Sequence, residues 1–228
     1  MRVIPDRRRA RCRGPRIPCI VAAVVAAFVV AGCAPRLRPL SGTPAPASLP
    51  RAALPPGQRR IVFKWQLDDP DLTARGEGAA RLAPPDSVRL DFFLAGGAAS
   101  GAAVLIDREL RLPSQAPDLS RRLVPPPPLL WGALGRLAVP PASDTVARVD
   151  GDTLRADIGN PIAWRLTFVR DTLRRVERVE GGRIIEWVER FADGRVRYRH
   201  ENNRRQLDLS ITRSDTVSAF DPAIWELP

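Results

Sequence analysis

The sequence has very few of the residues on which most metal and disulfide-bonded sites depend. It contains three cysteines and one histidine in 228 residues, too few for the usual cysteine and histidine zinc sites. They are also too few for a small secreted domain held together by several disulfides. The hydrophobic and charged fractions, 44% and 27%, are nevertheless those of a globular protein.

Lysine is almost absent, since Lys64 is the only lysine among 36 basic residues. Seven of the arginines lie in the first 32 residues beside a single aspartate, so about half of the formal charge of +11 belongs to that segment. Elsewhere arginines alternate with acidic residues, as in the stretch 174–180. Mixed charge of this kind is typical of a solvated face, and it argues against a nucleic-acid partner.

The longest apolar run, residues 17–30, follows an arginine-rich start. It is too short to span a membrane comfortably, but it fits the apolar core of a secretory signal. The run ends in Val30-Ala31-Gly32-Cys33, which resembles a bacterial lipobox. The resemblance implies that residues 1–32 are a lipoprotein signal peptide and that Cys33 is lipidated, which would hold the protein on a membrane. The alternative is an uncleaved signal in which Cys33 is only a small apolar residue.

The residue after Cys33 bears on the destination of such a lipoprotein. In the sorting rule for these proteins, an aspartate at that position retains the chain in the inner membrane. Ala34 stands there instead, which favours the outer membrane, facing the periplasm.

A proline-rich stretch, residues 33–57, follows the signal and holds seven prolines. Such a sequence cannot form regular hydrogen-bonded ladders and prefers an extended geometry. We therefore expect 33–57 to be a tether and residues 58–228 to form a single folded body.

Apolar and polar residues alternate with a period of two through much of that body. In the stretch 61–67, for example, Ile61, Phe63 and Trp65 share one face and Lys64 lies on the other. This pattern predicts antiparallel strands with one buried and one solvated side. It recurs in residues 87–94, 162–168, 195–200 and 207–212.

Turn residues separate the alternating runs. Asp150-Gly151, Gly181-Gly182, Asp193-Gly194 and Asn202-Asn203 are typical of hairpin turns that need a positive φ. The stretch 173–180 fits either a helix or a strand, and its place between a strand and a Gly-Gly turn favours a strand.

One apolar segment interrupts the strands. Leu130, Trp131, Leu134 and Leu137 would share one helical face, with prolines before the segment and Pro140 and Pro141 after it. This predicts one short helix that lies on the sheet as a lid or fills it as a plug.

The order of these features resembles the LolA/LolB-like fold of bacterial lipoprotein carriers and receptors, either the outer-membrane receptor branch or a related lipoprotein family of unknown function. The resemblance rests on residues 72–82, 84–90, the hairpin 92–106 and the closing residues 219–227. It implies a mainly β protein with an incompletely closed antiparallel barrel, and an apolar helix over a cavity that holds an acyl chain or a lipid-modified partner. Small residues at 74, 76, 78 and 80 suit a hollow interior. They equally suit bends in a barrel that tryptophan and phenylalanine fill.

The candidate cavity or lid residues come from the strands and the helix. They are Trp65, Leu72, Gly76, Gly78, Phe92, Leu130, Trp131, Leu134, Leu137 and Trp164. The sequence departs from the receptor in the turn 95–101, where the resemblance implies a protruding apolar side chain and this chain has no large residue. Binding of an apolar ligand is therefore better supported than insertion of lipoproteins into a membrane.

No catalytic or metal-binding arrangement is evident. His200 lacks a nucleophilic partner, and the acidic group 68–71 fits a turn better than a calcium loop. The sequence thus favours a lipid-binding lipoprotein that is not an enzyme and needs no cofactor. The rival is a scaffold lipoprotein whose filled barrel binds a protein on its outer face. A hydrolase with carboxylate chemistry is a third, weaker alternative.

Overall fold

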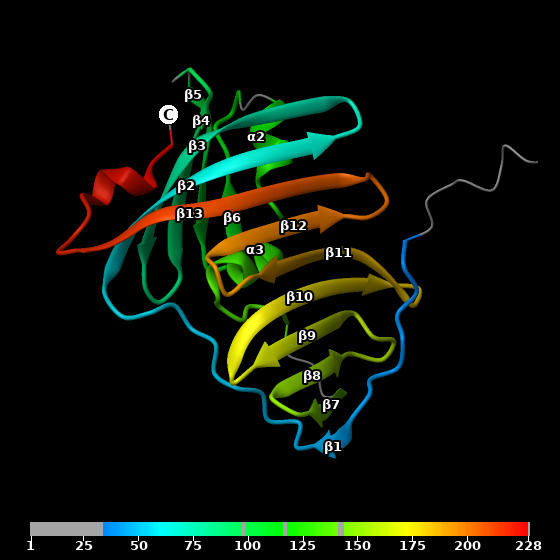
Figure 1. The fold of residues 1–228 in the computed structure, drawn as a ribbon. Coiled ribbons are helices and arrows are strands. Elements are labelled where there is room, and N and C mark those ends of the chain that lie inside the picture. Colours follow the sequence, from blue (N-terminus) through cyan, green and yellow to red (C-terminus); the bar gives the residue numbers. More distant parts are fainter. Residues whose placement is uncertain (1–33, 97–98, 116–117, 141–143, 228) are drawn as a thin grey trace, which may run out of the picture. The chain divides into compact units, whose positions relative to one another are not determined.

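Thirteen antiparallel strands form one curved sheet in the computed structural model, which describes residues 34–96, 99–115, 118–140 and 144–227 (Figure 1). Their spatial order is β1-β7-β8-β9-β10-β11-β12-β13-β2-β3-β4-β5-β6. The end strands β1 and β6 do not pair, so hydrogen bonds do not close the sheet. The prediction of a mainly β protein with an incompletely closed antiparallel barrel is confirmed.

The strands begin and end as follows: β1 Thr43–Ala45, β2 Gln58–Asp69, β3 Leu72–Ala83, β4 Ser87–Leu94, β5 Ala99–Ile106, β6 Glu109–Arg111, β7 Thr145–Asp150, β8 Thr153–Ile158, β9 Trp164–Val169, β10 Thr172–Glu180, β11 Arg183–Arg190, β12 Arg195–His200 and β13 Arg205–Val217. The four predicted turns join β7 to β8, β10 to β11, β11 to β12 and β12 to β13. The stretch 173–180 is a strand, as expected.

The first long strand of the body pairs with the last. β2 lies beside β13, with Trp65 opposite Leu209 and Leu67 opposite Leu207. Directly opposed residues share a face of an antiparallel sheet, so these apolar side chains point into the interior together. This pairing places β2–β6 on one side of the junction and β7–β13 on the other (Figure 1).

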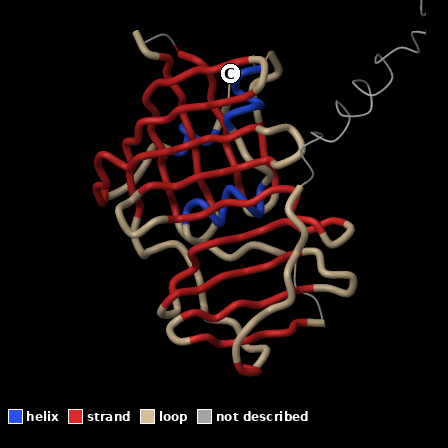
Figure 2. Tube along the Cα trace, turned by 45° about the vertical axis from the view of Figure 1, so that its right-hand side comes forward, coloured by secondary structure: helices blue, strands red, loops and turns tan. Residues whose placement is uncertain are grey.

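Two short helices lie against the inner face of the sheet (Figure 2). α2, Asp118–Leu123, contacts β5, and α3, Pro127–Leu134, contacts β10, β11 and β12. A Cβ on Gly132 would lie 2.8 Å from Val176 and 3.0 Å from Val188, so glycine lets α3 approach the sheet closely. None of the helices in the described ranges is long and apolar enough to cross a membrane.

The predicted helix is present but ends earlier than the apolar pattern suggests. Gly135 adopts the left-handed conformation, φ +89°, and its N–H donates to the carbonyl of Gly132, which terminates α3. Leu137 therefore lies beyond the helix, where its N–H donates to the carbonyl of Ala52. α2 and the 3-10 turn η1, Pro222–Trp225, were not predicted.

The described part of the proline-rich stretch, residues 34–57, is a strap that lies along the sheet. Its Pro35 carbonyl accepts a hydrogen bond from Ile184, the N–H of Leu37 donates to Gly182, and β1 pairs with β7. Leu54 is 7% exposed and belongs to the core. The strap is extended, as its prolines require, but it is not the free spacer that the composition suggested.

Candidate functional site

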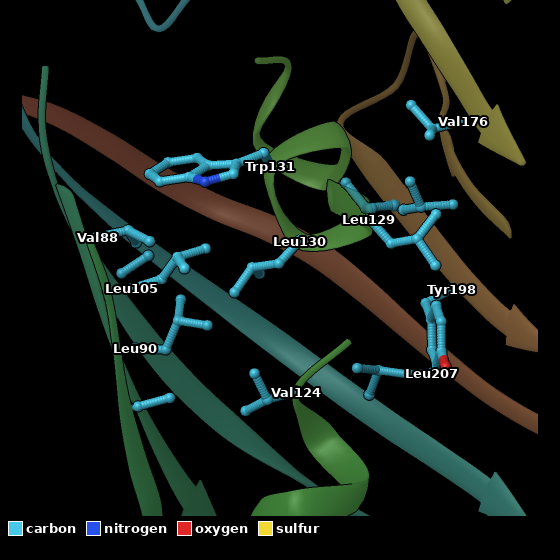
Figure 3. Close-up of a cluster of buried hydrophobic side chains, with 14 of the residues drawn as sticks. Val88, Leu90, Leu105, Val124, Leu129, Leu130, Trp131, Val176, Tyr198 and Leu207 are labelled. Carbon is cyan, nitrogen blue, oxygen red and sulfur yellow. The ribbon is translucent and has the colours of Figure 1, made fainter. Parts of the chain in front are cut away.

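An apolar cavity lies between α3 and the inner face of the sheet. Its volume is about 60 Å³, which is room for about two water molecules and far less than the several hundred cubic ångströms of a typical ligand pocket. Figure 3 shows Leu130 of α3, Leu90 of β4 and Leu207 of β13 among the side chains that converge here. In this conformation the interior is almost filled.

One end of the cavity opens towards the surface. Leu130 and Phe92 are fully buried at its inner end, whereas Leu134 is half-buried and Ile211 is 41% exposed. The opening, called the mouth below, is bordered by the cavity residues that are at least partly exposed: Ala133 and Leu134 of α3, Leu209 and Ile211 of β13, and Ile61 of β2.

The structure separates the predicted cavity residues into different environments. Phe92, Leu130 and Leu134 line the cavity. Leu72 is 37% exposed at the start of β3, and Trp164 is partly buried on β9 against the core. The remaining positions, Trp65, Gly76, Gly78, Trp131 and Leu137, do not border it.

The glycines of β3 make room for aromatic rings. A Cβ on Gly78 would lie 2.4 Å from the Phe63 ring, and one on Gly76 would lie 2.8 Å from the Trp65 ring. Trp65 is 2% exposed, and its indole N–H donates to the carbonyl of Glu77 over 2.8 Å. Of the two interpretations of these small residues, the structure favours a barrel filled by aromatic side chains at this place.

Trp131 is a core residue. It is 0% exposed, and its indole N–H donates to the carbonyl of Asp107 over 2.6 Å. The Arg136 guanidinium lies 4.5 Å from the ring centroid. Figure 3 places the ring beside Val88 and Leu105, so it joins α3 to the β4–β5 side of the sheet.

Paired charges occupy the inner face away from the mouth. Glu186 accepts a hydrogen bond from the Tyr198 hydroxyl over 2.8 Å and binds Arg178 over 2.6 Å. Burial, followed by the negative charge of Glu186, raises the pKa of the Tyr198 hydroxyl above its usual value. This tyrosine therefore remains a neutral donor.

Asp69, at the end of β2, binds α2 to the sheet. It contacts Arg122 of α2 over 2.7 Å and Arg205 of β13 over 2.8 Å. Burial opposes the charge of Asp69, but the hydrogen bonds from Arg205 and the backbone of Asp71, with the charge of Arg122, outweigh it and lower the pKa. The sequence had suggested only a turn at 68–71, because Arg122 and Arg205 are distant along the chain.

The outer face of the sheet carries a second set of ion pairs. Arg165 binds both carboxylate oxygens of Asp157, at 2.6 and 2.8 Å. Arg175 binds Glu177 over 2.9 Å and lies 4.0 Å from the centroid of the Trp187 ring. The buried carboxylates of the described chain are thus neutralised by arginines and not set opposite one another for acid–base chemistry. Its described residues also contain no cluster of three or more metal-binding side chains.

No family model matches the sequence, and no curated protein matches it. Among solved structures, the fold is similar to that of a LolA superfamily protein from Nitrosomonas europaea. The TM-score is 0.50 at 11% identity, over 76% of this chain and 92% of that one.

Two further solved structures resemble this chain. One is a putative outer membrane lipoprotein-sorting protein domain from Vibrio parahaemolyticus, with a TM-score of 0.42 and 8% identity over 74% of this chain and 89% of that one. The other is a DUF1329 family protein from Desulfovibrio piger, with a TM-score of 0.40 and 10% identity over 75% and 90% of the two chains. Taken with the open sheet and the helices on its inner face, the first similarity shows that this chain has a LolA/LolB-like fold.

Proposed function

We propose that this chain is a lipid-anchored protein of the bacterial envelope whose interior takes up an acyl chain or a lipid-modified partner. The observation that carries the proposal is an apolar cavity with a mouth, covered by a helix, in a LolA/LolB-like fold. A role in lipoprotein localisation agrees with that fold. We propose a binding role, in agreement with the pairing of the buried carboxylates Asp157, Glu177 and Glu186 with arginines.

Uptake requires the cavity to enlarge, because about 60 Å³ holds only two or three methylene groups. The element suited to move is α3. Prolines precede it, Gly135 ends it, and its Leu130 and Leu134 occupy the space that a chain would take. A ligand would replace the contacts of these leucines with the β12 and β13 side chains.

A neutral fluorescent dye tests this proposal. The probe is N-phenyl-1-naphthylamine, and the protein is the full chain carrying Cys33→Ser. We expect saturable fluorescence enhancement that dodecanoate reverses. Ala133→Trp places a large ring in the cavity wall and should abolish the enhancement, whereas Ala79→Trp adds the same ring on the opposite face of β3 and should not. Weak, non-saturable fluorescence enhancement in the protein that carries only Cys33→Ser would contradict the proposal.

The second candidate function is a scaffold that binds a protein on its outer face. The observation in its favour is the small cavity, which a filled barrel explains without any opening. The dye experiment decides between the two, because a permanently filled barrel binds no apolar probe at saturable sites.

The anchor itself is part of the proposal, and Cys33 lies outside the described residues. Ala34, which follows it, is 5% exposed, and the next residue bonds to β11 beside the turn at Gly181-Gly182. A lipid on Cys33 would therefore hold the β10–β11 turn near the membrane, in the outer membrane by the sorting rule. Cys33→Ser should abolish incorporation of labelled palmitate and release the protein from membranes. Persistent labelling of that variant would show that Cys33 is not the site.

A further inference from the structure

Arginines on the inner face differ in how their charge is balanced. Away from the mouth, Arg178 binds Glu186, and Arg122 and Arg205 both bind Asp69. Beside the end of α3, Arg190 of β11 and its neighbour Arg174 of β10 have no carboxylate within ion-pair distance among the described residues, and neither has Arg59 of β2.

Arg190 lies at the border of the cavity mouth. It is half-buried and stands opposite Val196, one of the residues that line the cavity. Its guanidinium lies beside the end of α3, since a Cβ on Gly135 would be 2.4 Å from Nη1. Its one hydrogen bond in the described structure is a long one, 3.5 Å to the carbonyl of Leu173.

The neighbours of Arg190 increase the local positive charge. Arg174 sits where the β9–β10 register shifts, between Leu173 and Arg175. Burial, followed by the positive charge of Arg174, lowers the pKa of Arg190 below its usual value. A half-buried cation beside another cation is costly unless an anion compensates it.

Arg59 lies on β2, three strands away from Arg190 in the order of the sheet. On β2 it is the next inward-facing position beyond Ile61, which lines the cavity. Its Nε atom is buried and has no hydrogen-bond partner. The acidic residues on two turns of the sheet already have arginine partners. Asp193 binds Arg195 over 2.6 Å, and Asp107 binds Arg136 over 3.5 Å.

We propose that Arg190, together with Arg174, binds the anionic headgroup of an amphiphile whose apolar chain enters the cavity. Carboxylate and phosphate share the required chemistry, because both accept paired hydrogen bonds from a guanidinium. The inference rests on the proposed function and adds the class of ligand. It explains why these arginines lack carboxylate partners beside the mouth of an apolar cavity.

A structural role for Arg190 is the competing explanation. A cation near the carbonyl end of a helix is favourable, and Arg190 lies at that end of α3. Such a role predicts a loss of stability on substitution, with no effect on which ligands bind.

The experiment compares competitors of equal chain length against the neutral dye described above, in the full chain carrying Cys33→Ser. The competitors are dodecanoate, dodecyl phosphate and the uncharged 1-dodecanol. We expect both anions to displace the dye at about tenfold lower concentration than the alcohol, the value of one charge-assisted hydrogen bond. Displacement by only one anion would identify carboxylate or phosphate as the preferred headgroup.

Substitutions of single arginines test which side chain causes the preference for anionic competitors. In Arg190→Gln the ratio between anionic and neutral competitors should fall to about twofold or less, and Arg190→Lys should retain part of it. Arg183→Gln removes the same charge from the other, exposed end of β11 and should leave the ratio as it was. If Arg190→Gln does not fold, Arg174→Gln provides the same comparison without altering the end of α3.

The outcomes separate this inference from the function on which it rests. Saturable dye binding without a preference for anions would overturn the headgroup site and leave the cavity. A preference that both Arg190→Gln and Arg174→Gln keep would do the same. If the dye does not bind at saturable sites, both proposals are wrong.

Discussion

The curved sheet is covered in two different ways. Helix α3 lies against β10, β11 and β12 and helix α2 against β5, whereas β8 lies under the strap, with Leu49 beside Leu154. Helix α3 has a glycine, Gly132, at its contact with the sheet and the cavity beneath it. The strap is bonded through its backbone at β11, at β7 and at Leu137.

This difference indicates which cover can move. Displacing α3 costs mainly apolar contacts, which an acyl chain can replace, and one hydrogen bond, from the Trp131 indole to Asp107, while the helix keeps its own backbone hydrogen bonds. Displacing the strap breaks backbone hydrogen bonds that no apolar ligand can replace. We therefore expect ligand-linked changes at α3 and a strap that remains in place.

The largest effect is expected for Trp131→Ala, which removes the ring that fixes α3 to the β4–β5 side. Because the side chain is 0% exposed, the variant should lose about 3–5 kcal/mol of unfolding free energy. Urea denaturation measures this loss. Trp225→Ala, at a half-buried position in η1, should cost clearly less. A loss below about 1 kcal/mol would mean that α3 is a loosely held lid and not part of the core.

Leu54→Ala tests the strap in the same way. Leu54 is 7% exposed within the core cluster, so we expect a loss of about 2–3 kcal/mol. The matched control is Leu40→Ala, at a half-buried position of the same segment, where the loss should be smaller. If both variants lost a negligible amount of unfolding free energy, residues 34–57 would be the free tether that the proline content suggested.

The sequence was sufficient for the regular elements of the sheet. Alternation with a period of two marks strands because one face is buried, and Gly181, Gly182 and Gly194 adopt the positive φ that their turns require. The prolines before α3 likewise predicted a helix start. Local patterns of this kind depend on neighbouring residues, which the sequence shows directly.

The sequence was not sufficient to predict how the helices cover the sheet or which residues surround the mouth. α2 has only six residues, three of them charged, and its link to Asp69 spans 53 positions. The small residues at 76 and 78 do not reveal which aromatic ring lies over them. Arg174 and Arg190 look like any other arginines of an alternating strand until the β9–β10 register shift and α3 place them together.

The smallest expected effect on the free energy of unfolding concerns Asp69 of β2, whose carboxylate binds Arg122 of α2. Asp69→Asn leaves Arg122 and Arg205 without their shared carboxylate and should cost about 2 kcal/mol. Because the folded chain lowers the pKa of Asp69, this stabilisation is complete above the pKa of the unfolded chain, about 4. It is lost as the pH falls through the lower pKa of the folded state.

The measurement is urea denaturation of both proteins between about pH 6 and pH 2, a range that brackets the ordinary aspartate pKa. The stability difference between wild type and Asp69→Asn should be constant at the upper end and shrink below about pH 4. Glu109→Gln removes the carboxylate from an exposed ion pair with Arg111 and should change little at any pH. A difference for Asp69→Asn that does not depend on pH would show that its charge is not what holds α2. The attachment of α2 would then depend on its apolar contacts, such as those of the buried Leu123.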